Sequence, residues 1–347
     1  MSKNLLHSHS PPRIFAFSVL VTVGALVGVA YGMGTEAVIV AAILMVIEIT
    51  FSFENAIVNA KVLATMSPFW QKIFLTIGIL IAIFGMRIIF PIAVVAISAS
   101  LDWMTVIDLA LNHPAEYAQK LAASHTKIAA FGGMFLAMLG LHFFFNDNKN
   151  THWIDAIERP IEKYARTWAY IPVAVAILLI VTVLPGNHHQ ADTLIAGAVG
   201  IVTYLVVHGL SELAGRTKTA TSAVLKTGMA GFIAFLYLEV LDASFSLDGV
   251  IGAFAITHNV VLIAVGLGVG AVWVRSLTVY MVRKKTLQEY IYLEHGAFYT
   301  VLALATFMLV SIFVHVSEFI AGSVGIVFIT AAIVSSIRHG KSKKITI

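Results

Sequence analysis

Long apolar runs separated by short polar connections make up most of the chain. They lie at about 14–31, 36–60, 72–98, 128–145, 168–185, 192–211, 228–257, 259–282, 289–314 and 319–337. Each run has at least 18 residues, and a helix needs roughly 20 to cross a bilayer. The pattern predicts an all-α polytopic membrane protein with about ten transmembrane helices, in one domain over 1–347. The first run is interpreted as a helix rather than a signal peptide, because it lacks a clear small-x-small cleavage site.

Composition supports this prediction. Of the 347 residues, 59% are hydrophobic and only 12% are charged, whereas a soluble domain carries about 25% charged residues. The chain therefore has too few charges to cover a water-facing surface, and a lipid bilayer is its expected surroundings. The net charge of +4 is spread over short connections, which does not indicate nucleic-acid binding.

The basic residues predict an orientation. If the N-terminus is cytoplasmic, 18 of the 22 lysines and arginines fall in inside connections, and only Lys120 and Lys127 fall outside. Basic residues concentrate on the cytoplasmic side of membrane proteins. The expected location is the inner or plasma membrane, with several passes and both termini in the cytoplasm.

Five acidic residues lie deep within apolar runs: Glu48, Glu54, Glu239, Asp242 and Asp248. An ionised carboxylate at the bilayer centre costs about 3 kcal/mol or more. We therefore expect these side chains to face the interior of the helix bundle, where protons, arginines or a cation compensate them. Arg87 and Arg275, which also fall within spans, are the expected charge-compensating residues.

The two acidic stretches resemble each other. The stretch from Glu48 to Glu54 and the stretch from Asp242 to Asp248 both contain an acid, two residues, Phe-Ser, an apolar residue and a second acid. A glycine-containing run with one arginine follows each stretch, and then a third helix. This pattern predicts repeats of three helices, at about 36–145 and 228–315. The predicted topology inverts one repeat relative to the other, as in many secondary transporters.

Helix geometry adds a requirement. Residues six apart on an unbroken helix differ by about 240° in direction, so Glu48 and Glu54 would not share a face. Glu239 and Asp242 would share one. Convergence of all the acids near the bilayer midplane therefore predicts helix breaks at about 52–55 and 246–249. Asn55 is the expected neutral carbonyl ligand.

The residue types favour a hard cation. The chain has no cysteine, and oxygen ligands suit Mn²⁺, Mg²⁺ or Ca²⁺. Five acids and two arginines leave a charge of −3, which one divalent ion and one proton would neutralise. These residues predict a carrier of a divalent cation, with H⁺ coupling as an option and no tightly bound cofactor. The Glu294-His295 pair near the inner end of a span is either an interfacial pair or a metal entry point.

The two acidic motifs resemble those of the TerC-like integral membrane proteins, a family named for tellurite resistance and grouped with lysine-exporter-like transporters. They occur here as Glu48-Ile-Thr-Phe-Ser-Phe-Glu54-Asn55 and Glu239-Val-Leu-Asp242-Ala-Ser-Phe-Ser-Leu-Asp248-Gly249. The resemblance covers about 36–145 and 228–337 and implies export of manganese. This sequence departs from the family pattern at Glu54, where an aspartate is usual, and at Gly249, where a small polar residue is usual.

Two other functions compete with a metal transporter. Carboxylates also bind ammonium groups, so an exporter of a cationic solute such as lysine remains open. An intramembrane hydrolase that uses two acids to activate water is the alternative from another class. Asp242 and Asp248 fall on one helix, however, and the chain has no Gly-x-Gly-Asp, His-Glu-x-x-His or Gly-x-Ser-x-Gly motif. We therefore expect no enzymatic activity and assign no catalytic residue.

Overall fold

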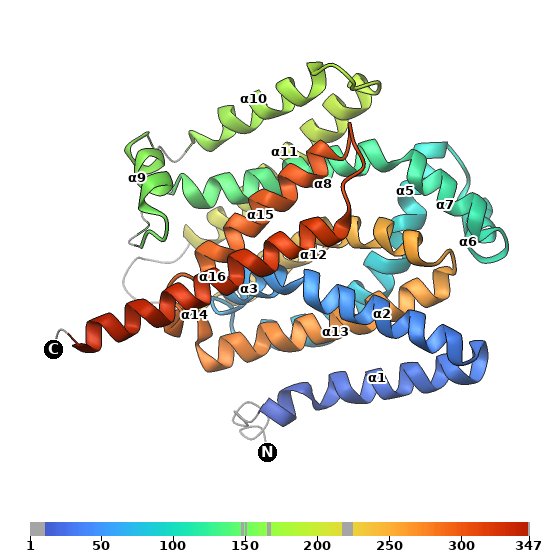
Figure 1. Ribbon diagram of the computed structural model, residues 1–347, viewed down its shortest axis with the longest axis horizontal. Helices are drawn as coiled ribbons and strands as arrows, with labels where there is room; N and C mark the ends of the chain where they lie inside the picture. Colours follow the sequence, from blue (N-terminus) through green and yellow to red (C-terminus); the bar gives the residue numbers. More distant parts are fainter. Residues whose placement is uncertain (1–10, 147–148, 150, 165–167, 217–224, 346–347) are drawn as a thin grey trace. The chain divides into compact units, whose positions relative to one another are not determined.

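The computed structural model describes residues 11–146, 149, 151–164, 168–216 and 225–345. Side chains are described for these residues except 162–164, 214–216, 247–248, 318 and 341–345. The described chain is helical throughout, apart from turns and a single isolated bridge between Met66 and Lys226. Figure 1 shows the helices in chain order. The chain divides into two compact units that alternate along the sequence.

Unit 1 comprises Met1–Ser124 and Ala223–Thr286. Its helices are α1 (Pro11–Met33), α2 (Thr35–Phe51), α3 (Phe53–Leu63), α4 (Pro68–Leu80), the π-helix η1 (Ile81–Ile89), α5 (Phe90–Ala99), α6 (Trp103–Asn112), α7 (Pro114–Ala123), α12 (Gly228–Ile256) and α13 (Val260–Lys284). In Figure 1, α2 runs beside α13, and the two helices are in contact. Glycines allow this close approach, because a Cβ at Gly266 would lie 2.6 Å from the Cβ of Leu44.

Unit 2 comprises His125–Ser222 and Leu287–Ile347. Its helices are α8 (His125–Phe144), α9 (Asp155–Tyr164), α10 (Tyr170–Val183), α11 (Gln190–Arg216), α15 (Leu293–Val310) and α16 (Glu318–Ile345), and the short α14 (Thr286–Glu289) begins at the boundary. Helix α8 packs against α10, α11 and α15. It is the most buried of the candidate spans, which places the core of unit 2 along it.

The apolar helices support a membrane-spanning protein. Within the described ranges, eight helical segments are long and apolar enough to cross a membrane, or nine if the bent pair α2 and α3 counts as one span. Large apolar side chains on these helices face outward, including Leu20 (70% exposed) and Val327 (65% exposed). Such an exposed apolar surface suits contact with lipid rather than water.

By this length criterion the structure supports nine of the about ten predicted spans when the bent pair is counted. The run at 168–185 forms α10, which has only 14 residues. At 1.5 Å per residue it extends about 21 Å, less than the roughly 30 Å of a hydrocarbon core. The other nine predicted runs each contain a candidate span or the bent pair.

The helix break predicted at 52–55 is confirmed at its first residue. Helix α2 ends at Phe51, α3 begins at Phe53, and the axes of the two helices differ by 54°. The prediction of a second break at 246–249 is wrong, because α12 continues as one helix of 29 residues to Ile256. Asp242, Ser246 and Gly249 are spaced by four and then three residues, so an unbroken helix already places them on one face.

The π-helix η1 was not predicted from the sequence. It covers nine residues in the middle of the 32-residue span 68–99 and contains Arg87. Arg87 donates from Nη1 to the carbonyl of Ala82, five residues earlier, at 3.1 Å. Short π-helical segments are often found at functional sites.

A buried carboxylate connects α9 to the start of α15 in unit 2. Glu158 is 1% exposed and accepts hydrogen bonds from Lys149 Nζ at 2.8 Å and from the backbone amides of Trp153 and Ile154. His295 Nε2 lies 3.4 Å from its Oε2 and 2.7 Å from the carbonyl oxygen of Thr151. His295 therefore contacts the α9 region.

Candidate functional site

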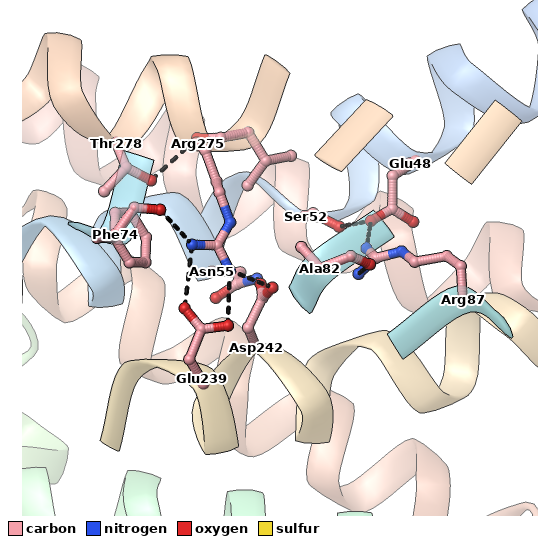
Figure 2. A network of polar contacts seen from close by, with 11 residues as sticks. Glu48, Ser52, Asn55, Phe74, Ala82, Arg87, Glu239, Asp242, Arg275 and Thr278 are labelled. Carbon is pink, nitrogen blue, oxygen red and sulfur yellow. Dashed lines mark hydrogen bonds and ion pairs between the residues drawn. The ribbon is translucent and has the colours of Figure 1, made fainter. Parts of the chain in front are cut away.

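Two arginine-centred clusters of buried charge lie within unit 1 (Figure 2). The first is at the end of α2, where Glu48 is 7% exposed. Arg87 Nη2 donates to Glu48 Oε1 at 2.5 Å, and Ser52 Oγ donates to the same oxygen at 3.3 Å. Gly270 of α13 provides room for this carboxylate, because a Cβ there would lie 2.5 Å from Glu48 Cβ.

The second cluster surrounds Arg275 on α13, which is 2% exposed. Its guanidinium binds Glu239 through two hydrogen bonds, Nη1 to Oε1 at 3.2 Å and Nη2 to Oε2 at 3.1 Å. Nη2 also donates to Asp242 Oδ2 at 3.1 Å. The predicted shared face of Glu239 and Asp242 is thereby confirmed, since one guanidinium reaches both side chains.

Phe74 of α4 completes the surroundings of Arg275. Its carbonyl oxygen accepts from Arg275 Nη1 at 3.0 Å, and its ring centre lies 4.2 Å from the guanidinium carbon. Gly78, one turn further along α4, leaves the space that the cluster occupies, because a Cβ there would lie 2.6 Å from Glu239 Oε1. Sequence reasoning did not identify Phe74, since a phenylalanine in an apolar run carries no distinguishing signal.

Asn55 connects the two acidic stretches. It lies in the first turn of α3, is 3% exposed, and donates from Nδ2 to Asp242 Oδ1 at 2.8 Å. The residue after the break in the first stretch therefore contacts the first aspartate of the second stretch, 187 positions away in the sequence. Helix geometry makes this contact possible, because the bend at Ser52 redirects α3 relative to α2.

Glu54 is buried differently from the other acids. It is 5% exposed, and no lysine, arginine or histidine in the described part of the chain is within ion-pair distance of it. Asp248 lies on α12, but its side chain is outside the described residues. The four described acids and two arginines leave this region with a formal charge of −2.

Buried oxygen acceptors in unit 1 also lack donors. Among the described residues, no hydrogen-bond partner reaches Asn55 Oδ1, Asn59 Oδ1 or Ser246 Oγ, and these residues are 3%, 1% and 7% exposed. Buried polar atoms are nearly always satisfied by protein, water or an ion. Asn59 was not predicted as a site residue, although it lies four residues after Asn55 in an apolar run, a spacing that places both on one helix face.

Three of the four described acids are divided between the two arginines, and Glu54 pairs with neither. Among the side chains that the structure describes, no three His, Asp or Glu residues are grouped to hold a metal ion. Glu48 pairs with Arg87, and Glu239 and Asp242 pair with Arg275. Convergence of all five acids on one cation therefore stays a prediction, and Arg87 and Arg275 contact the acids as the compensating role requires.

Comparison with known proteins gives one result. No curated protein and no solved structure matches this chain, and no comparison connects it to TerC-like proteins. The profile of one family matches residues 53–343, which include Glu54, Asn55, both arginines and the whole second acidic stretch. The chain thus belongs to the family described as a protein of unknown function, DUF475.

Proposed function

We propose that this protein transports a divalent cation across the membrane, with export of Mn²⁺ as the expected activity. One observation carries the proposal. Apolar helices of unit 1 bury four described acids and two arginines, together with oxygen acceptors that have no donor among the described residues. Intramembrane ionisable groups of this kind mark ion pathways in membrane proteins, and the excess charge of −2 equals that of one divalent ion in magnitude.

The ligand types support a hard cation. Carboxylate, amide and hydroxyl oxygens suit Mn²⁺, Mg²⁺ and Ca²⁺, and the buried acids, Asn55 and Ser246 supply all three types. Asp248 would add a further carboxylate from α12. The preference for manganese comes from the resemblance of the acidic motifs to TerC-like proteins.

Inverted three-helix repeats at about 36–145 and 228–315 are part of this proposal. The arginine on the second helix of each stretch pairs with the first acid of the same stretch, Arg87 with Glu48 and Arg275 with Asp242. The third helices, α8 and α15, pack together in unit 2. Such internal symmetry, with a broken helix at the ion site, is common among secondary transporters.

In the proposed mechanism the arginines hold the acids when no cation is bound. A cation that enters the site competes with the guanidinium groups for the carboxylate oxygens. When the guanidinium groups are released, the packing of α13 and η1 on α2 and α12 changes. Spare carboxylates such as Glu54 exchange protons, which would couple cation movement to H⁺. Buried ion pairs suit this role because a carboxylate that loses its arginine is left as an uncompensated buried charge, which is strongly unfavourable unless a cation replaces the arginine.

Proteoliposomes containing the purified protein test the proposal. Uptake of Mn²⁺, Mg²⁺, Ca²⁺, Zn²⁺ and lysine is measured against empty liposomes, with a pH gradient of either sign. We expect protein-dependent Mn²⁺ movement that depends on the gradient. Movement of lysine with no metal would replace the cargo by a cationic solute, and movement of none of the five would overturn the proposal.

A further inference from the structure

Asn55 and Gly249 occupy equivalent places in the two acidic stretches, but only one of them carries a side chain. Each lies seven residues after the first acid of its own stretch, Glu48 or Asp242. Asn55 donates to Asp242 at 2.8 Å. A Cβ at Gly249 would lie 3.4 Å from Glu48 Oε2. Each position therefore faces the first acid of the other stretch.

The two first acids consequently differ in how their oxygens are bound. Both oxygens of Asp242 accept a hydrogen bond, Oδ1 from Asn55 and Oδ2 from Arg275. Glu48 receives both Arg87 and Ser52 on Oε1. Within the described part of the chain, no donor reaches Glu48 Oε2, and the residue opposite it is glycine. We call the Asp242 side closed, because the Asn55 amide binds its second carboxylate oxygen, and the Glu48 side open, because no side chain stands at the equivalent position Gly249.

Two further buried oxygen acceptors belong to the helices that carry these contacts, α12 and α3. Ser246 shares a face of α12 with Gly249 at a spacing of three residues, and no described residue binds its buried Oγ. Asn55 donates from Nδ2 to Asp242, and no donor in the described part of the chain reaches its buried Oδ1. Buried oxygen lone pairs without donors require a ligand that brings positive charge or hydrogen-bond donors.

We infer that the cation binds on the Glu48 side, in the space left by the missing side chain at Gly249. Glu48 Oε2, Asn55 Oδ1 and Ser246 Oγ are its protein ligands, and the Arg275 cluster forms the closed half of the site. Gly249 is then a residue that determines whether the site accepts a cation. This inference depends on the proposed function, because it names the half of that site which takes the cargo.

Two substitutions at Gly249 with opposite expected effects test the inference. Gly249→Asn places an amide where Asn55 stands in the other stretch, so it should donate to Glu48 and weaken Mn²⁺ binding by on the order of tenfold. Gly249→Asp adds a carboxylate beside Glu48 and should tighten Mn²⁺ binding by roughly threefold or more. Both residues have a higher helix propensity than glycine, so α12 should be retained.

The control is Gly209→Asn on α11, the same change on a helix where a Cβ meets nothing within 4 Å. Binding of Mn²⁺ to the purified full-length protein is measured by equilibrium dialysis, and the metal-induced change in Tm is measured beside it. Wild-type affinity in both Gly249 variants would overturn the inference while leaving the proposed function intact. Absence of divalent-cation binding by the wild type would instead remove the proposed function. If Gly249→Asn gives no folded protein, Gly249→Asp alone decides. Tighter Mn²⁺ binding by that variant supports the inference, and unchanged or weaker binding overturns it.

Discussion

At the residue scale, Arg275 has the most demanding surroundings in unit 1. One guanidinium serves two carboxylates, a backbone carbonyl and an aromatic ring. The planar fork of arginine allows this combination, and the ammonium group of lysine cannot reproduce it. Arg275 is therefore expected to be essential to the fold of unit 1 as well as to any charge balance at the site.

Replacement of Arg275 by alanine should destabilise the protein by about 3–5 kcal/mol, because Glu239 and Asp242 would stay buried without their counter-charge. Thermal unfolding in detergent would measure the effect, with Arg283→Ala in the last turn of α13 as the control. The triple variant Arg275→Met, Glu239→Gln, Asp242→Asn removes all three charges and should regain much of the lost stability. Equal stability of Arg275→Ala and the wild type would contradict this account.

Glu54→Gln separates transport from folding. Because no described basic residue pairs with Glu54, neutralising it leaves no arginine unpaired, so insertion and yield should match the wild type. Mn²⁺ transport in proteoliposomes should fall by about tenfold or more, as expected for a group at a metal site. Asp102→Asn at the start of α6 is the matched control, since asparagine also caps helices. Undiminished transport by Glu54→Gln would show that this carboxylate is no part of the site.

The sequence identified the charged members of the site but not how they pair. Charges in apolar runs are conspicuous, so Glu48, Arg87, Asp242 and Arg275 could be named without a structure. Their division between two arginines depends on which helices pack together. Phe74 contacts Arg275 through a carbonyl and a ring, and a pattern of polar and apolar residues does not reveal either contact. The space at Gly249 can be recognised only from its position next to Glu48 in the fold.

At the element scale, apolar periodicity predicted where helices occur better than where they bend. The bend at Ser52 was expected from the need to bring Glu48 and Glu54 together, and it is present. The same argument failed for α12, because Asp242, Ser246 and Gly249 already share a face of a regular helix. The π-helix η1 depends on local backbone hydrogen bonding within an apolar segment and left no sequence signal.

The attachment of α9 should depend on pH. Burial alone would raise the pKa of Glu158. Hydrogen bonds and charges from His295 and Lys149 outweigh burial and lower this pKa from 4.5 to about 2. A lowered pKa means that the stabilisation is complete above the unfolded value of 4.5 and is lost as the pH falls towards about 2. Fluorescence of Trp153, whose ring lies 5.7 Å from that of Tyr299, should report release of α9 in this range.

Comparison with Trp153→Phe isolates the signal of this tryptophan, and Glu158→Gln is the test variant. Glutamine has no charge to lose, so the change between pH 4.5 and 2 should disappear in that variant. A wild-type signal that stays constant over the same range would contradict the proposed attachment.

At the scale of the whole molecule, composition and length predicted about ten spans, of which the described structure supports eight, or nine with the bent pair α2 and α3. An apolar run has the same composition whether its helix is buried in protein or faces lipid. The sequence therefore could not distinguish the run at 168–185 from a full span. The alternation of the chain between two compact units was also not predicted. It depends on contacts between distant helices, which an apolar pattern does not specify.

The orientation of the termini tests the number of crossings. Concentration of basic residues on one side predicts that both ends are cytoplasmic, which requires an even number of spans. If the bent pair α2 and α3 forms a ninth span, α10 must provide the tenth crossing. A green fluorescent protein fused after Ile347 should fluoresce, and an alkaline phosphatase fused there should be inactive. The opposite pair of results would mean that α10 does not cross and that the protein has an odd number of spans.

The short α10 has a consequence for the lipids around it. An apolar helix of 14 residues, about 21 Å long, is shorter than a typical hydrocarbon region, and local thinning of the bilayer is one way to accommodate its crossing. Hydrophobic mismatch of this size costs a fraction of a kcal/mol per Å, so membrane thickness becomes a variable that acts on the protein. The crossing should be favoured in bilayers of short-chain lipids and disfavoured in thick, ordered ones, which would make the protein sensitive to the composition of its own membrane.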